Sequence, residues 1–152
     1  RGFEGDRACQ ADQRRLGGVA LDPDLSMLGP EASTVTVAQL RESIRTSSSS
    51  LKAVLLDQQR LAGLGNLLVD ETLWRARLDP VRPARSLDGA EQRRLASAIR
   101  STVATLARRG GSHTGDLQVA RQPGAVCPRC ATPLQRRSVA TRTTWSCPLE
   151  QR

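Results

Sequence analysis

The sequence is poor in aromatic residues: it contains one phenylalanine, two tryptophans and no tyrosine. Proteins that bind single-stranded nucleic acid stack successive bases on aromatic side chains, so that class of protein is not expected. Long apolar runs are also absent, and no stretch reaches the length that a membrane-spanning helix needs. The opening residues do not have the pattern of a signal peptide. These absences predict a cytoplasmic protein.

Lysine is nearly absent as well, with Lys52 as the only one, yet arginine makes the chain strongly basic. Lysine and arginine together number 23 against 15 acidic residues, which gives a formal net charge of +8. A chain of this charge attracts polyanions, and its binding to them weakens as the salt concentration rises. The charge balance therefore indicates a nucleic-acid partner. The length of 152 residues suits one domain with an appendage.

Three of the four cysteines lie near the C-terminus in a pattern typical of metal sites. Cys127 and Cys130 form a C-x2-C pair, and Cys147 follows. This pattern in a basic, intracellular type of sequence favours a metal over disulfides. Position 150, where a second C-x2-C pair would end, holds Glu150. Glutamate is also a zinc ligand, so we expect zinc on the three cysteines with Glu150 or water as the fourth ligand. The alternative is a hairpin held by packing without metal.

The stretch from 51 to 78 predicts two helices joined by a tight glycine turn, because apolar residues recur at helical spacing on both sides of residues 63–66. Gly63 is expected to close the first helix in a left-handed conformation, and Asn66 to cap the second. Unpartnered N–H groups at a helix N-terminus attract anions. Gly65 and Asn66 are therefore candidate phosphate ligands. The alternative is an ordinary helical hairpin that uses glycine for a sharp turn.

The flanking segments add two helices. Thr34 or Thr36 is expected to cap a helix that ends near Arg45, and the serine run before position 51 supplies the next cap. A long helix is expected over about 88–109, where Gly110 stops it.

The C-terminal segment predicts strands. Residues 117–119 are expected to form a short strand, and 135–139 with 141–146 a hairpin that turns near Ala140. The predicted fold class is mainly α with a small β-hairpin. We expect a basic lead-in over 1–20, a helical DNA-binding domain over 21–111 and a zinc-finger-like hairpin over 112–152.

Taken in order, these motifs resemble the C-terminal half of the bacterial Fpg/Nei family of DNA glycosylase/AP lyases. LLDQ, LAGLGN, DETLWRA and a closing Pro80 match its helix–two-turn–helix domain, and residues 28–32 (LGPEA) match the segment before it. The cysteines, together with the R-x-T-x-x-C motif that runs from Arg142 to Cys147, resemble its zinc finger. The likeness begins at about Asp12.

The resemblance implies roles for four further residues. The lysine matching Lys52 faces DNA near the lesion in the family; the alternative is a solvated surface lysine. The arginine matching Arg142 grips phosphates that flank the damaged nucleotide. In the loop similar to residues 12–17, the arginine matching Arg14 fills the space left by an everted base. Leu16 stands where the family has an aromatic wedge, a place that leucine can also fill in a kinked duplex. The alternative for this loop is a disordered basic lead-in.

The family's nucleophile is an N-terminal proline with a neighbouring glutamate, whereas this chain opens with RGFE. We therefore expect a nucleoid-associated protein that binds double-stranded DNA, damaged or abasic, without base excision. One alternative is residual glycosylase or AP lyase activity, either through the terminal amine or Lys52, or with a partner protein that supplies the catalytic half. The other is a sequence-specific helix-turn-helix regulator. Asp70 and Glu71 disfavour it, because acidic side chains suit a phosphate-lined groove poorly.

Overall fold

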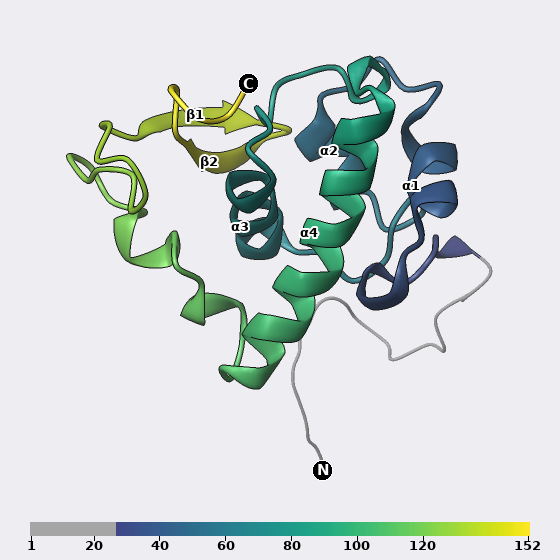
Figure 1. Cartoon of the computed structure of the whole chain (residues 1–152), viewed down its shortest axis with the longest axis horizontal. Helices are drawn as coiled ribbons and strands as arrows, with labels where there is room; N and C mark the ends of the chain where they lie inside the picture. Colours follow the sequence, from purple (N-terminus) through teal and green to yellow (C-terminus); the bar gives the residue numbers. More distant parts are fainter. Residues whose placement is uncertain (1–26) are drawn as a thin grey trace, which may run out of the picture.

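The structure, a computed structural model, describes residues 27–152. Arg14 and Leu16 lie outside the described residues, as does Cys9. Within residues 27–152 the α-helices are α1 (Val37–Ile44), α2 (Leu51–Leu56), α3 (Asn66–Ala76) and α4 (Gly89–Arg108). The longest of them, α4, packs against both α1 and α3 (Figure 1). None of the described helices is long and apolar enough to cross a membrane.

Local side-chain caps fix where three of these helices begin. Thr36 forms a capping box with Gln39 at the start of α1, and Ser50 accepts a hydrogen bond from the backbone of Ala53 at the start of α2. Asp88 forms a second capping box with Glu91 at the start of α4. Each cap satisfies an N–H group that the helix itself leaves unpaired. The starts of α1 and α2 confirm the predicted caps, with Thr36 rather than Thr34 as the first.

The apolar stripes of the four helices meet in one core. A fully buried aliphatic side chain contributes about 1.5–3 kcal/mol to folding, so a core of this kind is the main stabilising feature of the helical body. Its fully buried members include Leu40, Ile44, Leu51, Leu55, Leu73, Leu95 and Ile99.

The connection between α2 and α3 differs from the predicted one. The first helix ends at Leu56, not at Gly63, because Asp57 takes an extended conformation. The side chain of Gln58 then organises the turn: its amide oxygen accepts from Gly63 N at 2.9 Å, and its amide nitrogen donates to Leu64 O at 3.0 Å. Gly63 does have the expected positive φ of 104°, but it serves this turn and not a helix end.

The segment before α1 braces the same connection. Gly29 N donates to Gln58 O, and Ala62 N donates to Pro30 O, each at 2.8 Å. A Cβ at position 29 would lie 2.4 Å from the carbonyl carbon of Arg60, so only glycine permits this approach. Residues 28–32 (LGPEA) therefore support the connection between α2 and α3.

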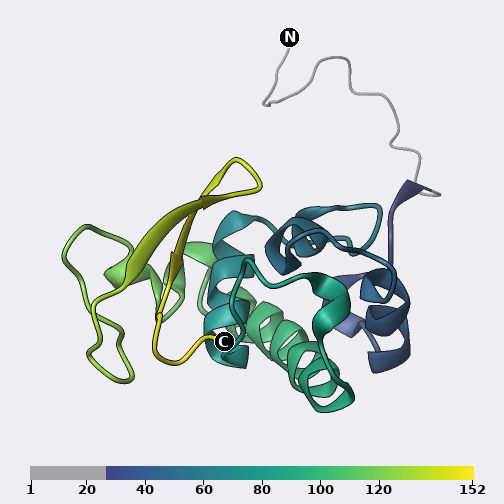
Figure 2. The same ribbon diagram turned by 90° about the horizontal axis from the view of Figure 1, so that it is seen from above.

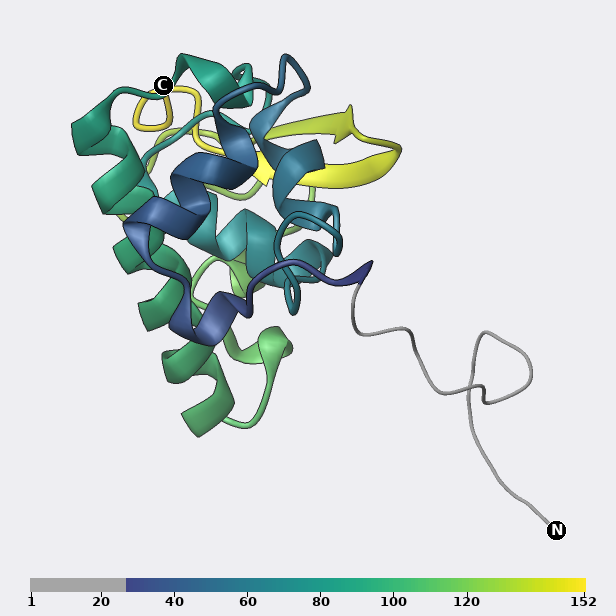
Figure 3. The ribbon, with the colours of Figure 1, turned by 90° about the vertical axis from the view of Figure 1, so that its right-hand side faces the viewer.

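The C-terminal segment forms a two-stranded antiparallel hairpin of β1 (Gln135–Val139) and β2 (Arg142–Ser146). Ala140 and Thr141 both have positive φ, which is typical of the tight turns that join such strands. The hairpin and the mainly α fold class are confirmed. Figures 2 and 3 show that the hairpin and the α2–α3 connection lie on the same side of the helical body.

The strand predicted over residues 117–119 is wrong. Gln118–Ala120 form a 3-10 helix, in which Ala120 N donates to Leu117 O. The cause is an acidic side chain from another element: Glu71 accepts hydrogen bonds from the backbone of Asp116 and Leu117 and turns the chain there.

Candidate nucleic-acid interface

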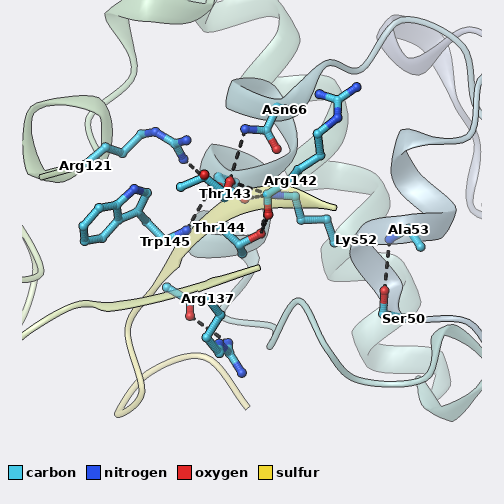
Figure 4. A network of polar contacts seen from close by, with 12 residues as sticks. Ser50, Lys52, Ala53, Asn66, Arg121, Arg137, Arg142, Thr143, Thr144 and Trp145 are labelled. Atoms are coloured by element: carbon cyan, nitrogen blue, oxygen red, sulfur yellow. Dashed lines mark hydrogen bonds and ion pairs between the residues drawn. The ribbon is translucent and has the colours of Figure 1, made fainter. Parts of the chain in front are cut away.

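Lys52 is the centre of a buried polar network between α2, α3 and β2. Its side chain is 0 % exposed, and its Nζ donates to Asp70 Oδ1 and Thr144 Oγ1, each at 2.7 Å (Figure 4). A third hydrogen bond reaches Thr143 O at 3.2 Å. The ammonium group of Lys52 is buried. This matches neither expectation for the residue, a side chain that faces DNA or one that is solvated at the surface. A buried charge is stable only with partners of this kind.

Asp70 joins the same network from α3. Its second oxygen accepts from the Arg121 guanidinium and, at 3.2 Å, from Trp145 N. Burial lowers the pKa of Lys52, and the Asp70 carboxylate opposes that effect. The Asp70 carboxylate thus connects α3 to α2, to the segment after α4 and to the hairpin.

Glu71, the next residue, likewise connects α3 to another part of the chain, the segment around residues 115–117. Its carboxylate, almost fully buried, accepts from Leu117 N at 2.9 Å, from Asp116 N at 3.1 Å and from Arg75 Nε at 2.8 Å. Gly115 contacts it so closely that a Cβ there would lie 2.4 Å from Glu71 Oε1. The sequence pattern does not indicate the structural role of Asp70 and Glu71, because their partners are distant along the chain.

The N-terminus of α3 lies open beside this network. Gly65, not Asn66, is the N-cap residue, and Asn66 is the first residue of the helix, which corrects the predicted cap. No side chain caps α3, and nothing within the described residues occupies the space that a Cβ of Gly65 would enter. The first backbone N–H groups of α3 are therefore available to an external acceptor.

Asn66 ties this helix end to the hairpin. Its Nδ2 donates to Thr143 O at 3.2 Å, and the same carbonyl accepts from Lys52. The residue before Thr143 is Arg142, whose side chain is exposed. Figure 4 shows Arg142 and Asn66 on the same side of the network. The structure thus brings Gly65, Asn66 and Arg142 to one surface and places Lys52 beneath it.

The three C-terminal cysteines also converge. The sulfurs of Cys127, Cys130 and Cys147 lie within 4.8 Å of one another, and those of Cys130 and Cys147 are 3.6 Å apart. Tetrahedral zinc, with Zn–S bonds of about 2.3 Å, holds its sulfurs roughly 3.8 Å apart, so the cluster fits the metal. Burial raises the pKa of the Cys147 thiol to about 11. A metal must therefore displace a proton to bind there.

The predicted fourth ligand is not part of this cluster. Glu150 Oε1 instead accepts from Arg129 Nε at 2.6 Å. Burial alone would raise the pKa of the Glu150 carboxyl, but the hydrogen bond from Arg129 lowers it. The only ligand atoms gathered within the described residues are the three thiols.

A protein-family model and curated relatives both relate this chain to formamidopyrimidine-DNA glycosylases. The model of the formamidopyrimidine-DNA glycosylase H2TH domain matches residues 28–117. The formamidopyrimidine-DNA glycosylase of Thermus thermophilus is 42 % identical over 145 residues, which is 83 % of this chain and 54 % of the relative. That of Symbiobacterium thermophilum is 38 % identical, over 95 % of this chain and 55 % of the relative. The chain thus spans about half the length of these relatives.

Solved structures show the same likeness. The crystal structure of the MutM (Fpg) protein from Thermus thermophilus is 39 % identical with a TM-score of 0.74, over 82 % of this chain and 54 % of that one. The complex between Lactococcus lactis Fpg and DNA containing an abasic site is 30 % identical with a TM-score of 0.75. It covers 84 % of this chain and 52 % of the other.

Proposed function

Because the chain belongs to the formamidopyrimidine-DNA glycosylase H2TH family, we propose that its helical domain and hairpin bind double-stranded DNA in DNA repair. The observation that carries the proposal is the pairing of two anion-binding features on one surface. The uncapped N-terminus of α3 offers backbone N–H groups and the positive end of the helix dipole. Arg142 adds a full positive charge from the hairpin.

These two features suit neighbouring phosphates of a DNA strand. Contacts to phosphate position a protein on the duplex but do not read its sequence. We therefore propose binding that depends little on sequence and strongly on salt, with damaged or abasic DNA as the preferred ligand, since the Lactococcus lactis relative is solved with such DNA. A salt series with plain, abasic-analogue and mismatched duplexes tests this. An affinity that does not fall as salt rises would contradict it.

Asn66 provides a prediction for the helix side of this surface. An amide nitrogen has two hydrogens, and Thr143 O takes one of those on Nδ2, so the other is free for a phosphate. We expect Asn66→Ala to weaken duplex binding by about 2- to 12-fold, the effect of one hydrogen bond of about 0.5–1.5 kcal/mol. The slope of affinity against salt should not change, because asparagine is neutral.

Fluorescence anisotropy with a labelled duplex measures both quantities. Gln59→Ala, which removes an exposed neutral amide from the α2–α3 connection, is the matched control and should bind like the wild type. The Tm of each variant is measured as well, because Asn66 also holds the hairpin. A folded Asn66→Ala protein with wild-type affinity would place the phosphate elsewhere.

We further propose that residues 27–152 bind DNA without forming a covalent intermediate. An amine nucleophile must be unprotonated and must reach the sugar. The only lysine, Lys52, has no exposed surface and three oxygen partners. Borohydride reduction with an abasic duplex, followed by peptide mapping, is therefore expected to yield no adduct on Lys52. An adduct at Lys52 would contradict this and favour the lyase alternative.

The structure does not favour a sequence-reading regulator. Such a protein projects exposed side chains of one helix into the major groove. In α3 most side chains are buried and none is fully exposed, and Asp70 and Glu71 are bound within the protein.

A further inference from the structure

We propose that an ion pair between Arg129 and Glu150 takes the structural place of a fourth metal–ligand bond, so that a metal on Cys127, Cys130 and Cys147 keeps an open fourth position. The two residues belong to different turns of the cysteine site. Arg129 lies between Cys127 and Cys130, and Glu150 lies in the turn after Cys147. Their ion pair therefore joins the same two turns that a fourth ligand at position 150 would join through the metal.

Arg129 is held in place by α3. Its guanidinium lies over the Trp74 ring, 3.9 Å from the centroid, and also donates to Trp74 O. Trp74 in turn donates from its indole nitrogen to Cys127 Sγ at 3.3 Å. The guanidinium is thus fixed by three contacts, to the Trp74 ring, to Trp74 O and to Glu150. Stacking and a charge-assisted hydrogen bond both favour this position.

Hydrogen bonds of Gln151 hold the turn after Cys147 in place and require no metal. Gln151 is buried, and its side chain accepts from Cys147 N at 2.8 Å and donates to Leu78 O at 3.0 Å. The backbone of Gln151 donates to Cys147 O at 3.1 Å. These contacts hold Glu150 where Arg129 reaches it. The only ligand atoms that gather at the site within the described residues are the three thiols, while Glu150 Oε1 is held by Arg129.

A site with three protein ligands differs chemically from one with four. Three thiolates leave one tetrahedral position for water or an added donor, as in zinc sites that exchange a ligand. Thiolate ligands suit metals that also accept a further soft ligand. The donor set therefore favours a small thiol as the added ligand.

Cobalt(II) absorption tests the open position, because sulfur ligands give charge-transfer bands whose intensity follows their number. The full chain is kept reduced with a phosphine and titrated with Co²⁺, and 2-mercaptoethanol is then added. We expect the wild type to bind cobalt and its spectrum to change when the thiol is added. A wild-type protein that binds no cobalt, or whose spectrum ignores the thiol, would overturn the proposal.

Two substitutions at position 150 distinguish a role of Glu150 in the ion pair from a role as a metal ligand. Glu150→Gln should still respond to the added thiol, because Glu150 is not a ligand and the fourth position stays open. Glu150→Cys should bind cobalt more tightly and not respond, because a fourth protein thiolate fills the position. A Glu150→Gln spectrum that responds to the thiol while the wild-type spectrum does not would identify Glu150 as a ligand and overturn the proposal.

Arg129→Gln tests the partner directly. Without the guanidinium, Glu150 is free to occupy the fourth position, so this variant should lose its response to the thiol. The double variant Arg129→Gln, Glu150→Gln should regain it. A thiol response in Arg129→Gln equal to that of the wild type would show that Arg129 does not hold Glu150 away from the metal. Circular dichroism of each apo-protein establishes that the variants are folded.

Discussion

Replacing Lys52 by methionine is expected to destabilise the protein by about 3–5 kcal/mol, the cost of removing one partner from a buried ion pair. Methionine fills much of the space of the lysine stem but supplies no donor. Asp70 then stays buried with its contacts to Arg121 and Trp145 N, and it loses the ammonium at 2.7 Å. Urea denaturation, followed by tryptophan fluorescence, gives the free energy of unfolding.

A surface ion pair of the same type provides the control. Arg45 and Glu42 are 3.2 Å apart, and their side chains are 57 % and 73 % exposed. Arg45→Met should therefore leave the denaturation midpoint almost unchanged, because exposed pairs contribute little. The double variant Lys52→Met, Asp70→Asn should not recover the loss, because it leaves the Arg121 guanidinium without its carboxylate partner. A Lys52→Met midpoint equal to that of Arg45→Met would refute the structural role of the network.

Arg142→Ala is expected to produce the largest loss of DNA affinity. The side chain is exposed and lies beside the N-terminus of α3, so its removal deletes a charge-assisted contact without disturbing the core. Such a contact is worth about 1–3 kcal/mol, or roughly 5- to 150-fold in affinity. The slope of log affinity against log salt should become less negative by about 0.9, the contribution of one neutralised phosphate.

The same loss is expected on every duplex, because a phosphate contact carries no sequence information. Arg108→Ala, which removes an arginine from the C-terminal end of α4, is the matched control for a change of net charge. It should affect affinity and slope far less. If the two variants lose affinity equally, the binding reflects the overall charge of the protein and not the proposed surface.

Features of the fold that depend on neighbours along the chain can be predicted from the sequence. Helical starts at Thr36, Ser50 and Asp88 follow from side chains that reach N–H groups three residues away. The hairpin follows from strand-forming residues on both sides of a two-residue turn. The gathering of Gly65, Asn66 and Arg142 was implied by the family resemblance, and no local rule would have brought the hairpin to that helix end.

The environments of the charged side chains depend instead on contacts between elements that are distant in the sequence. Lys52 is buried because Asp70 and Thr144, distant in the sequence, meet it from two other elements. Glu150 forms an ion pair with Arg129 because the two cysteine turns, distant in the sequence, meet in the fold. Whether a charge faces water, DNA, a metal or another side chain depends on the partners within a few ångströms. Those partners come from α3, β2 and the cysteine turns, and they meet only when the chain has folded.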